Sequence, residues 1–197
     1  MVLAYHLVIS AYGFWMPNDP RGSGSDFIRA WEIFYQGRAT YTSERRSLAH
    51  MEHDRELRMN QKRALRYDPV VFSRDQIAAV GAGFAHAVRR SAFIIHACSI
   101  LAEHAHLVVA RHSYAIEQVT NQIKGEATKE LNRQKLHPFP DVIFRSGKQH
   151  SPWADDFWDV YLDSIADLRR AIVYVEENPL KENRARQFWP FVVEYHP

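Results

Sequence analysis

The stretch "FIIHACSILAEHAHLVVAR", residues 93–111, decides the fold because it predicts two buried strands joined by a tight turn. The strands are expected at Phe93–Ala102 and His104–Arg111. Successive side chains of a strand point to opposite faces, so His104 and His106 should lie on one face, about 7 Å apart. The stretch therefore predicts a strand pair in which two imidazoles interrupt an apolar surface.

One more strand and three helices are expected around this pair. They are a strand at 4–11, a helix after the N-cap Ser73, a helix from about Tyr114 to Pro138, and a helix capped by Ser164 and stopped by Pro179. Short strands are a further option in the otherwise irregular segment 141–163. Strands mixed with helices in this order indicate an α+β fold, with an antiparallel sheet and helices on one face.

The 197 residues are expected to form a single domain with two additions. An insertion at about 12–72 holds a loop rich in Pro and Gly, followed by a highly charged segment at 31–68 that suits a solvated helix. An aromatic tail at about 180–197 is expected to pack back on the body. No internal repeat is visible.

Composition excludes several classes of protein. The single cysteine, Cys98, rules out an intrachain disulfide framework and a cysteine-based zinc site. A formal charge of +2 does not by itself indicate nucleic-acid binding, so any such surface must come from local clusters of cations. The N-terminus lacks the features of a signal peptide, and no apolar run approaches the ~20 residues of a membrane helix. A cytoplasmic protein is expected, with no membrane partner.

The histidine pair has two explanations. His104 and His106 could be ordinary histidines hydrogen-bonded at a sheet edge, or they could hold one divalent ion. Both lie in apolar sequence, where an unsatisfied polar group costs roughly 1–3 kcal/mol, and a metal ion would satisfy both. Tyr174 and Asn178, four residues apart on the last helix, should lie on one side of it and face the rim of the sheet.

Together these stretches resemble the single-tyrosine HUH transposases, named for a His-hydrophobic-His strand, and most closely the REP-associated tyrosine transposases. Four segments carry the resemblance: "YGFWMPNDPRGSG", "EHAHLVV", "QIKGEATKELN" and "LRRAIVYVEENPLK". Glu103 stands where that family has Asn or Asp, and Ala105 is smaller than the usual middle residue. The resemblance implies a ferredoxin-like α+β sheet, the HUH endonuclease fold.

The resemblance also implies a site and a reaction. His104, His106 and Asn178 would be the metal ligands, for Mg²⁺ or Mn²⁺, and Tyr174 would be the nucleophile. The reaction would be metal-dependent cleavage and rejoining of single-stranded DNA through a 5′-phosphotyrosine, at elements that contain a hairpin. Neither the general base nor the physiological metal follows from the sequence.

Substrate binding would need cations near the site. The expected DNA-binding residues are Arg89, Arg90, Lys124, Lys129, Arg133, Arg169 and Arg170, although each could also be an ordinary surface charge. Stacking by Trp153, Trp158 or Trp189 is possible, with core packing as the alternative. The resemblance places the protein at the nucleoid and leaves open whether it acts as a monomer or a homodimer.

Three other functions remain open at this point. Histidine-triad nucleotide hydrolases also alternate histidines along a strand, but they need a third one where this chain has Val108. A domesticated, catalytically silent protein could bind hairpin DNA without cutting it. The metal site could also be purely structural, although three ligands suit an open catalytic site better.

Overall fold

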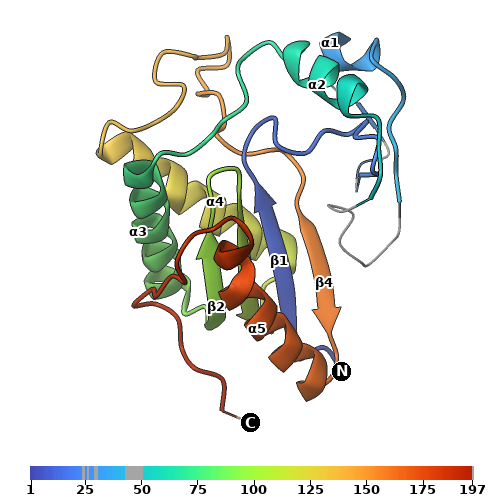
Figure 1. The fold of residues 1–197 in the computed structure, drawn as a ribbon. Coiled ribbons are helices and arrows are strands. Elements are labelled where there is room, and N and C mark those ends of the chain that lie inside the picture. Colours follow the sequence, from blue (N-terminus) through green and yellow to red (C-terminus); the bar gives the residue numbers. More distant parts are fainter. Residues whose placement is uncertain (24, 26, 29–30, 43–50, 197) are drawn as a thin grey trace.

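The structure is a computed structural model that describes residues 1–23, 25, 27–28, 31–42 and 51–196. The described residues form four strands and five helices (Figure 1). In chain order these are β1 (Ala4–Ser10), α1 (Trp31–Phe34), α2 (Arg55–Arg63), α3 (Arg74–Ser91), β2 (Ile95–Ile100), β3 (His104–Ala110), α4 (Ile116–Arg133), β4 (Trp158–Leu162) and α5 (Ile165–Lys181). Of the charged segment predicted at 31–68, residues 43–50 lie outside the described residues, and the remainder includes α1 and α2.

The strands form one sheet in the order β2-β3-β1-β4, and each neighbouring pair is antiparallel. Two strand-helix-strand crossovers, through α3 and α4, give the ferredoxin-like β-α-β-β-α-β order. The α+β class and the antiparallel sheet are therefore confirmed. The predicted strands at 93–102 and 104–111 are real but shorter, because the residues at their outer ends continue as turns and loops.

One face of the sheet is covered by α3 and α4, which pack on each other as well as on the strands. Leu7, Ile9 and Leu107 project from the sheet into this core and have no exposed surface. From the helices, Phe84 and Ile123 fill the space between the layers. A Cβ on Gly83 would lie 2.4 Å from Cα of Ala127, so glycine is required for the two helices to approach this closely.

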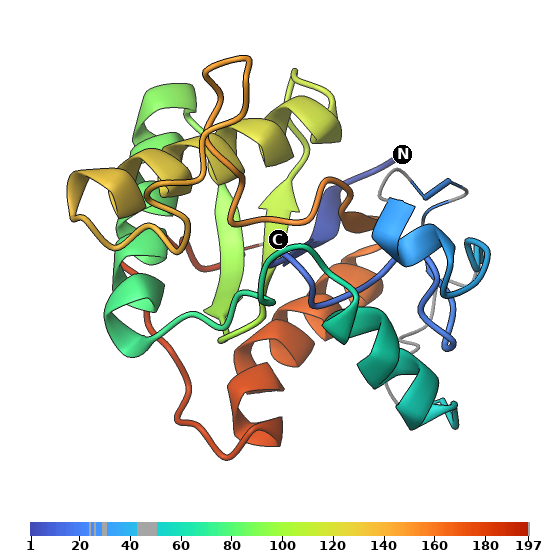
Figure 2. The same ribbon diagram turned by 90° about the horizontal axis from the view of Figure 1, so that it is seen from above.

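The opposite face is covered by α5, which corrects the prediction that helices cover one face only (Figure 2). Leu168, Ala171 and Val175 of α5 pack on Ala97 and Val108 of the sheet. Because strand side chains alternate, the same strands supply apolar residues to both faces, and the second apolar face needs its own helix. Figure 2 shows the sheet lying between α3 and α4 on one side and α5 on the other.

The ends of α3 and α5 can be compared with the sequence signals. Ser73 caps α3 in a full capping box with Gln76, and Ser164 caps α5 by accepting from the backbone N–H of Asp167, as predicted. Pro179 does not stop α5, however, because the helix continues to Lys181. Pro179 lacks an N–H to donate within the helix, yet α5 continues for two more residues and ends near Asn183, which has a left-handed φ of 56°.

The C-terminal tail packs back on the body, as expected. Val192 forms a parallel bridge with Ile95 at the outer edge of β2, and Val193 N–H donates to the carbonyl of Ile95 at 2.8 Å. The ring of Trp189 occupies the space beside Gly81, where a Cβ would lie 2.1 Å from the ring. Across the described ranges, no helix combines the length and the apolar character needed to cross a bilayer.

Candidate active site

The predicted histidine pair lies on the face of the sheet that α5 covers. In β3, His104, His106 and Val108 point toward this face, while Leu107 points into the core below α3 and α4. The ring centroids of His104 and His106 are 4.9 Å apart. The alternation of the strand therefore places both imidazoles together, as the sequence indicated.

Helix α5 places Tyr174 and Asn178 at the same site. The Tyr174 ring meets the His106 ring edge to face, with centroids 5.7 Å apart. Asn178 is buried, and Lys181 holds its ammonium 3.8 Å from the centroid of the Tyr174 ring. The three residues follow at spacings of four and three, so they form one line along the helix. Tyr174 and His106 make this contact within a single chain.

A cavity of about 880 Å³ joins these residues. His104, His106, Tyr174, Asn178 and Lys181 all line it, and its other walls come from the loop after β1 and from the segment before β4. Aromatic side chains form much of this outer wall: Phe14, Trp15, Phe144, Phe157 and Trp158. The site is thus a concave space large enough for part of a nucleic-acid strand, with the polar groups at its base.

Burial keeps the imidazoles neutral. It lowers the pKa of His104 from 6.5 to about 4. Burial also lowers the pKa of His106 well below 6.5, helped by the neighbouring His104, His6 and the charge of Lys181. Neutral imidazoles have the lone pairs that metal ligands require, so both side chains are in the right state to bind a divalent ion at neutral pH.

A third histidine, His6, belongs to the site and was missed by the sequence analysis. It lies in β1 opposite Val108, so it faces α5 as well. Its Nε2 is 3.1 Å from Nδ1 of His106, and its ring contacts the Tyr174 ring at a centroid distance of 5.5 Å. The sequence "AYHLVIS" could have indicated that His6 and the core residue Leu7 point to opposite faces of the strand. Only the pairing of β1 with β3 brings His6 to His106.

The donor set fits a divalent metal ion. His104 Nδ1 is buried without a hydrogen-bond partner, which is costly unless something else satisfies it. Nδ2 of Asn178 is also buried without a partner, but an amide nitrogen only donates, so Asn178 would bind a metal ion through its Oδ1. No group of three or more His, Cys, Asp or Glu in the described part of the chain is placed to hold a metal ion, so the three histidines do not form such a set. The ligand set predicted from the sequence is His104, His106 and Asn178. It contains only two residues of these four types, because its third member is an amide.

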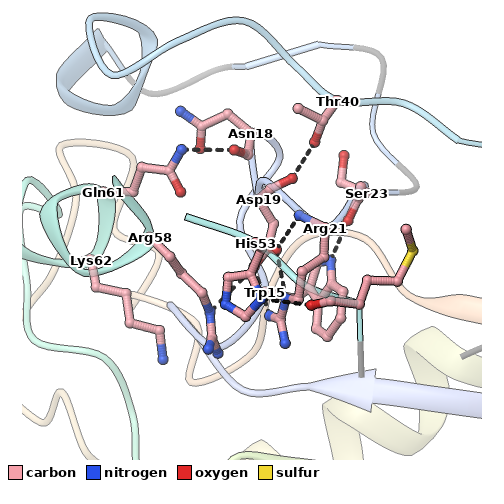
Figure 3. A network of polar contacts seen from close by, with 12 residues as sticks. Trp15, Asn18, Asp19, Arg21, Ser23, Thr40, His53, Arg58, Gln61 and Lys62 are labelled. Carbon is pink, nitrogen blue, oxygen red and sulfur yellow. Dashed lines mark hydrogen bonds and ion pairs between the residues drawn. The ribbon is translucent and has the colours of Figure 1, made fainter. Parts of the chain in front are cut away.

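The loop after β1 fixes one wall of the cavity through a buried polar network (Figure 3). Arg21 donates from Nε and Nη2 to the carboxylate of Asp19, both at 2.7 Å, and its guanidinium lies 3.8 Å from the Trp15 ring centroid. Gln61 of α2 donates to the carbonyl of Asn18 at 2.7 Å. A bidentate ion pair of this kind has a defined geometry, so it holds Trp15 in place at the cavity wall.

The same loop also contacts the histidine pair directly. Phe14 stacks on His104 with the rings almost parallel, at an interplanar angle of 5° and a centroid distance of 4.7 Å. Lys62 of α2 lies 5.7 Å from the Phe14 ring and 3.4 Å from the carboxylate of Glu103. The insertion between β1 and α3 therefore takes part in forming the site.

The seven predicted DNA-binding cations do not gather around the cavity. Arg169 and Arg170 are exposed on α5, the helix of Tyr174, and Arg170 pairs with Asp167. The other surface cations lie on α3 and α4, across the sheet: Arg90 and Lys129 pair with Glu126, Arg133 with Glu130, and Arg89 contacts His86.

Lys124 requires a correction. It is buried, and its ammonium donates to the backbone carbonyls of Ala154, Asp155 and Asp156 at 2.9, 3.2 and 3.2 Å. Burial also lowers its pKa from 10.5 to about 8. Three carbonyl acceptors occupy the three N–H bonds of an ammonium, so Lys124 anchors the segment before β4 and has no N–H bond left to donate to a phosphate. Trp153 is likewise buried in the core and unavailable for stacking.

Comparisons with solved structures find several similar chains, among them two of low identity. One is a REP-associated tyrosine transposase bound to a REP hairpin, with 20% identity and a TM-score of 0.43 over 60% of this chain. The aligned part is 64% of that protein, slightly less than two thirds of its length. The other is a candidate transposase from Deinococcus radiodurans R1, with 9% identity and a TM-score of 0.40 over 94% of this chain and 93% of that one.

Comparisons at the level of sequence give no match. No protein-family profile matches the chain, and no curated protein is found as a relative.

Proposed function

We propose that this chain is a metal-dependent endonuclease and transposase that cleaves and rejoins single-stranded DNA through a 5′-phosphotyrosine on Tyr174. One observation carries the proposal. Tyr174 on α5 and His106 on β3 are 68 positions apart by residue number, yet their rings are 5.7 Å apart in a cavity that His104 and Asn178 also line. If His104 and His106 were ordinary histidines with no role in a reaction, nothing would explain why a tyrosine and a buried amide lie beside them.

His104, His106 and Asn178 would hold the metal ion, which is Mg²⁺ or Mn²⁺ for a mixed nitrogen and oxygen donor set. When bound, the ion would polarise the scissile phosphate and stabilise the negative charge that develops on it. The chain's own contribution is the placement of the ligands. His104 is held by stacking on Phe14 and Asn178 by its position on a packed helix.

Tyr174 would attack the phosphorus with its phenol oxygen. The bond from phosphorus to Oη forms while the bond from phosphorus to the 3′ oxygen breaks, so the phenol proton is lost and the leaving oxygen becomes a 3′-hydroxyl. The phosphodiester energy is retained in the tyrosine ester, and a 3′-hydroxyl of another strand can reverse the step. Lys181 adds positive charge to the same cavity, which favours the approach of a phosphate.

The cavity walls suit single-stranded DNA better than a duplex. Exposed rings at a concave site stack with unpaired bases, and every base has a face that such rings can contact. Phe144 is 42% exposed at the cavity, and Trp158 is partly exposed there. The hairpin expected near the cleavage site rests on the motif resemblance alone.

The test is covalent trapping. The protein is incubated with Mn²⁺ and single-stranded DNA oligonucleotides that carry hairpins, and adducts are separated on denaturing gels. We expect an adduct for the wild type and for Tyr161→Phe, a control tyrosine on β4 that does not line the cavity, and none for Tyr174→Phe. An adduct in Tyr174→Phe would exclude Tyr174 as nucleophile. Tight hairpin binding by the wild type without any cleavage would favour the silent binding protein instead.

A further inference from the structure

His6 is a partly buried titratable group beside the proposed reaction that has no role in it. It lies in β1, the strand beside β3, and it is diagonal to His106 in the register, because Val8 pairs with His106 and His6 with Val108. Diagonal neighbours on one face of a sheet are within reach of ring side chains. The two rings are nearly stacked, at an interplanar angle of 26° and a centroid distance of 5.3 Å.

The contact between the two histidines is a hydrogen bond with only two possible directions. His6 Nε2 and His106 Nδ1 are 3.1 Å apart, and a neutral imidazole has one nitrogen that donates and one that accepts. If Nδ1 of His106 donates, its Nε2 keeps a free lone pair. If Nδ1 accepts, Nε2 carries the proton and cannot bind a metal ion.

We infer that His6 is a positioning residue that accepts the proton of His106 Nδ1 and so leaves His106 Nε2 as the metal-binding nitrogen. This rests on the proposed function. Metal-binding histidines commonly donate their second ring nitrogen to a neighbouring acceptor, which fixes both the tautomer and the ring orientation. In proteins that acceptor is often a carboxylate or a carbonyl, and here an imidazole from the adjacent strand takes its place.

His6 is not itself assigned as a ligand. Its Nε2 already contacts His106, and the described residues contain no set of three or more His, Cys, Asp or Glu placed around a metal position. The two predicted histidine ligands are then oriented in different ways. His106 is held by a hydrogen bond within the sheet, and His104 is held by the Phe14 ring from the loop after β1.

The test measures Mn²⁺ binding without DNA, from the electron paramagnetic resonance signal of free Mn²⁺. His6→Leu removes the acceptor, and we expect the dissociation constant to rise by about 10–100-fold. His6→Gln keeps an oxygen acceptor near the position of Nε2 and should recover most of the affinity. His96→Leu, in the edge strand β2 and outside the cavity, should bind as the wild type does. Wild-type affinity in His6→Leu would overturn the inference.

Two further outcomes separate this inference from the proposed function. If the wild type binds no Mn²⁺, or if His104→Leu binds Mn²⁺ normally, the metal site and the role of His6 both fail. If His104→Leu loses binding and His6→Leu does not, only the role of His6 fails. Spin-echo spectra of bound Mn²⁺ should show two imidazole nitrogens coordinated to the ion, both in the wild type and in His6→Gln. Three coordinated imidazole nitrogens in the wild type would make His6 a ligand and overturn the inference.

A second measurement needs no variant and therefore no assumption about folding. Long-range ¹H–¹⁵N NMR spectra of the metal-free wild type report which nitrogen of each histidine carries the proton. We expect His106 to be protonated at Nδ1 and unprotonated at Nε2. The opposite tautomer of His106 would contradict the inference.

Discussion

The two faces of the sheet use the same strands for different purposes. The face below α3 and α4 is mainly apolar, with Leu7, Ile9 and Leu107 fully buried. The face below α5 is divided, with a small core around Leu168 and Val175 at one end and three imidazoles at the other. The larger core supplies most of the hydrophobic stabilisation, which allows the second face to bury polar groups that cost stability.

The largest expected loss of stability comes from the apolar face. Phe84→Ala removes a fully buried ring between α3 and the sheet, and we expect the free energy of unfolding to fall by about 3–5 kcal/mol. Urea denaturation followed by circular dichroism measures it, with Val71→Ala, a 62% exposed position, as the control. A loss below 1 kcal/mol would mean that this face is not the main core.

A comparable change on the other face should affect both stability and reaction. Leu168→Ala leaves a cavity between α5 and the sheet, with an expected loss of about 2–5 kcal/mol. Because Tyr174 and Asn178 lie on the same helix, the rate of adduct formation should fall as well. Val173→Ala, which is half-exposed on α5, is the matched control and should leave both measurements unchanged. Normal rates in a destabilised Leu168→Ala would separate the packing of α5 from the site.

The two capped helices allow a smaller, paired comparison. Ser73→Ala and Ser164→Ala each remove a side chain that accepts from a backbone N–H, and each should cost about 1 kcal/mol. Only Ser164→Ala should also slow adduct formation, since α5 carries the nucleophile. Equal rates for both variants would show that the start of α5 does not affect the position of Tyr174.

The smallest expected effect on stability comes from the histidine site itself. His104→Leu replaces a partly buried imidazole whose buried Nδ1 lacks a partner, so the free energy of unfolding should change by no more than about 1 kcal/mol while Mn²⁺ binding is lost. The reverse swap three positions along the same strand, Leu107→His, should destabilise by about 2 kcal/mol or more, because it buries a polar ring in the apolar core. Similar stabilities for the two variants would contradict the division of the faces.

What the sequence could predict was local. The alternation of β3 placed His104 and His106 on one face, and the helical spacing placed Tyr174 and Asn178 together. The caps Ser73 and Ser164 were visible because a cap is satisfied by a residue three positions away. These are the features that a few neighbouring residues determine.

What the sequence could not predict depends on tertiary contacts. His6 and His106 are 100 positions apart, and only the register of β1 against β3 makes them neighbours. Lys124 looked like a surface cation on a helix, and its burial is decided by the carbonyls of a segment 30–32 residues later. The side of the sheet that α5 covers was also invisible, since an apolar stripe on a helix does not say which face it meets.

The most direct test of the central claim is to locate the covalent bond. After reaction with single-stranded hairpin DNA and Mn²⁺, the protein is digested with nuclease and trypsin and analysed by tandem mass spectrometry. The account predicts a nucleotide attached to Tyr174, in the tryptic peptide 171–181 that follows Arg170 and ends at Lys181. A nucleotide attached to any other residue would contradict it.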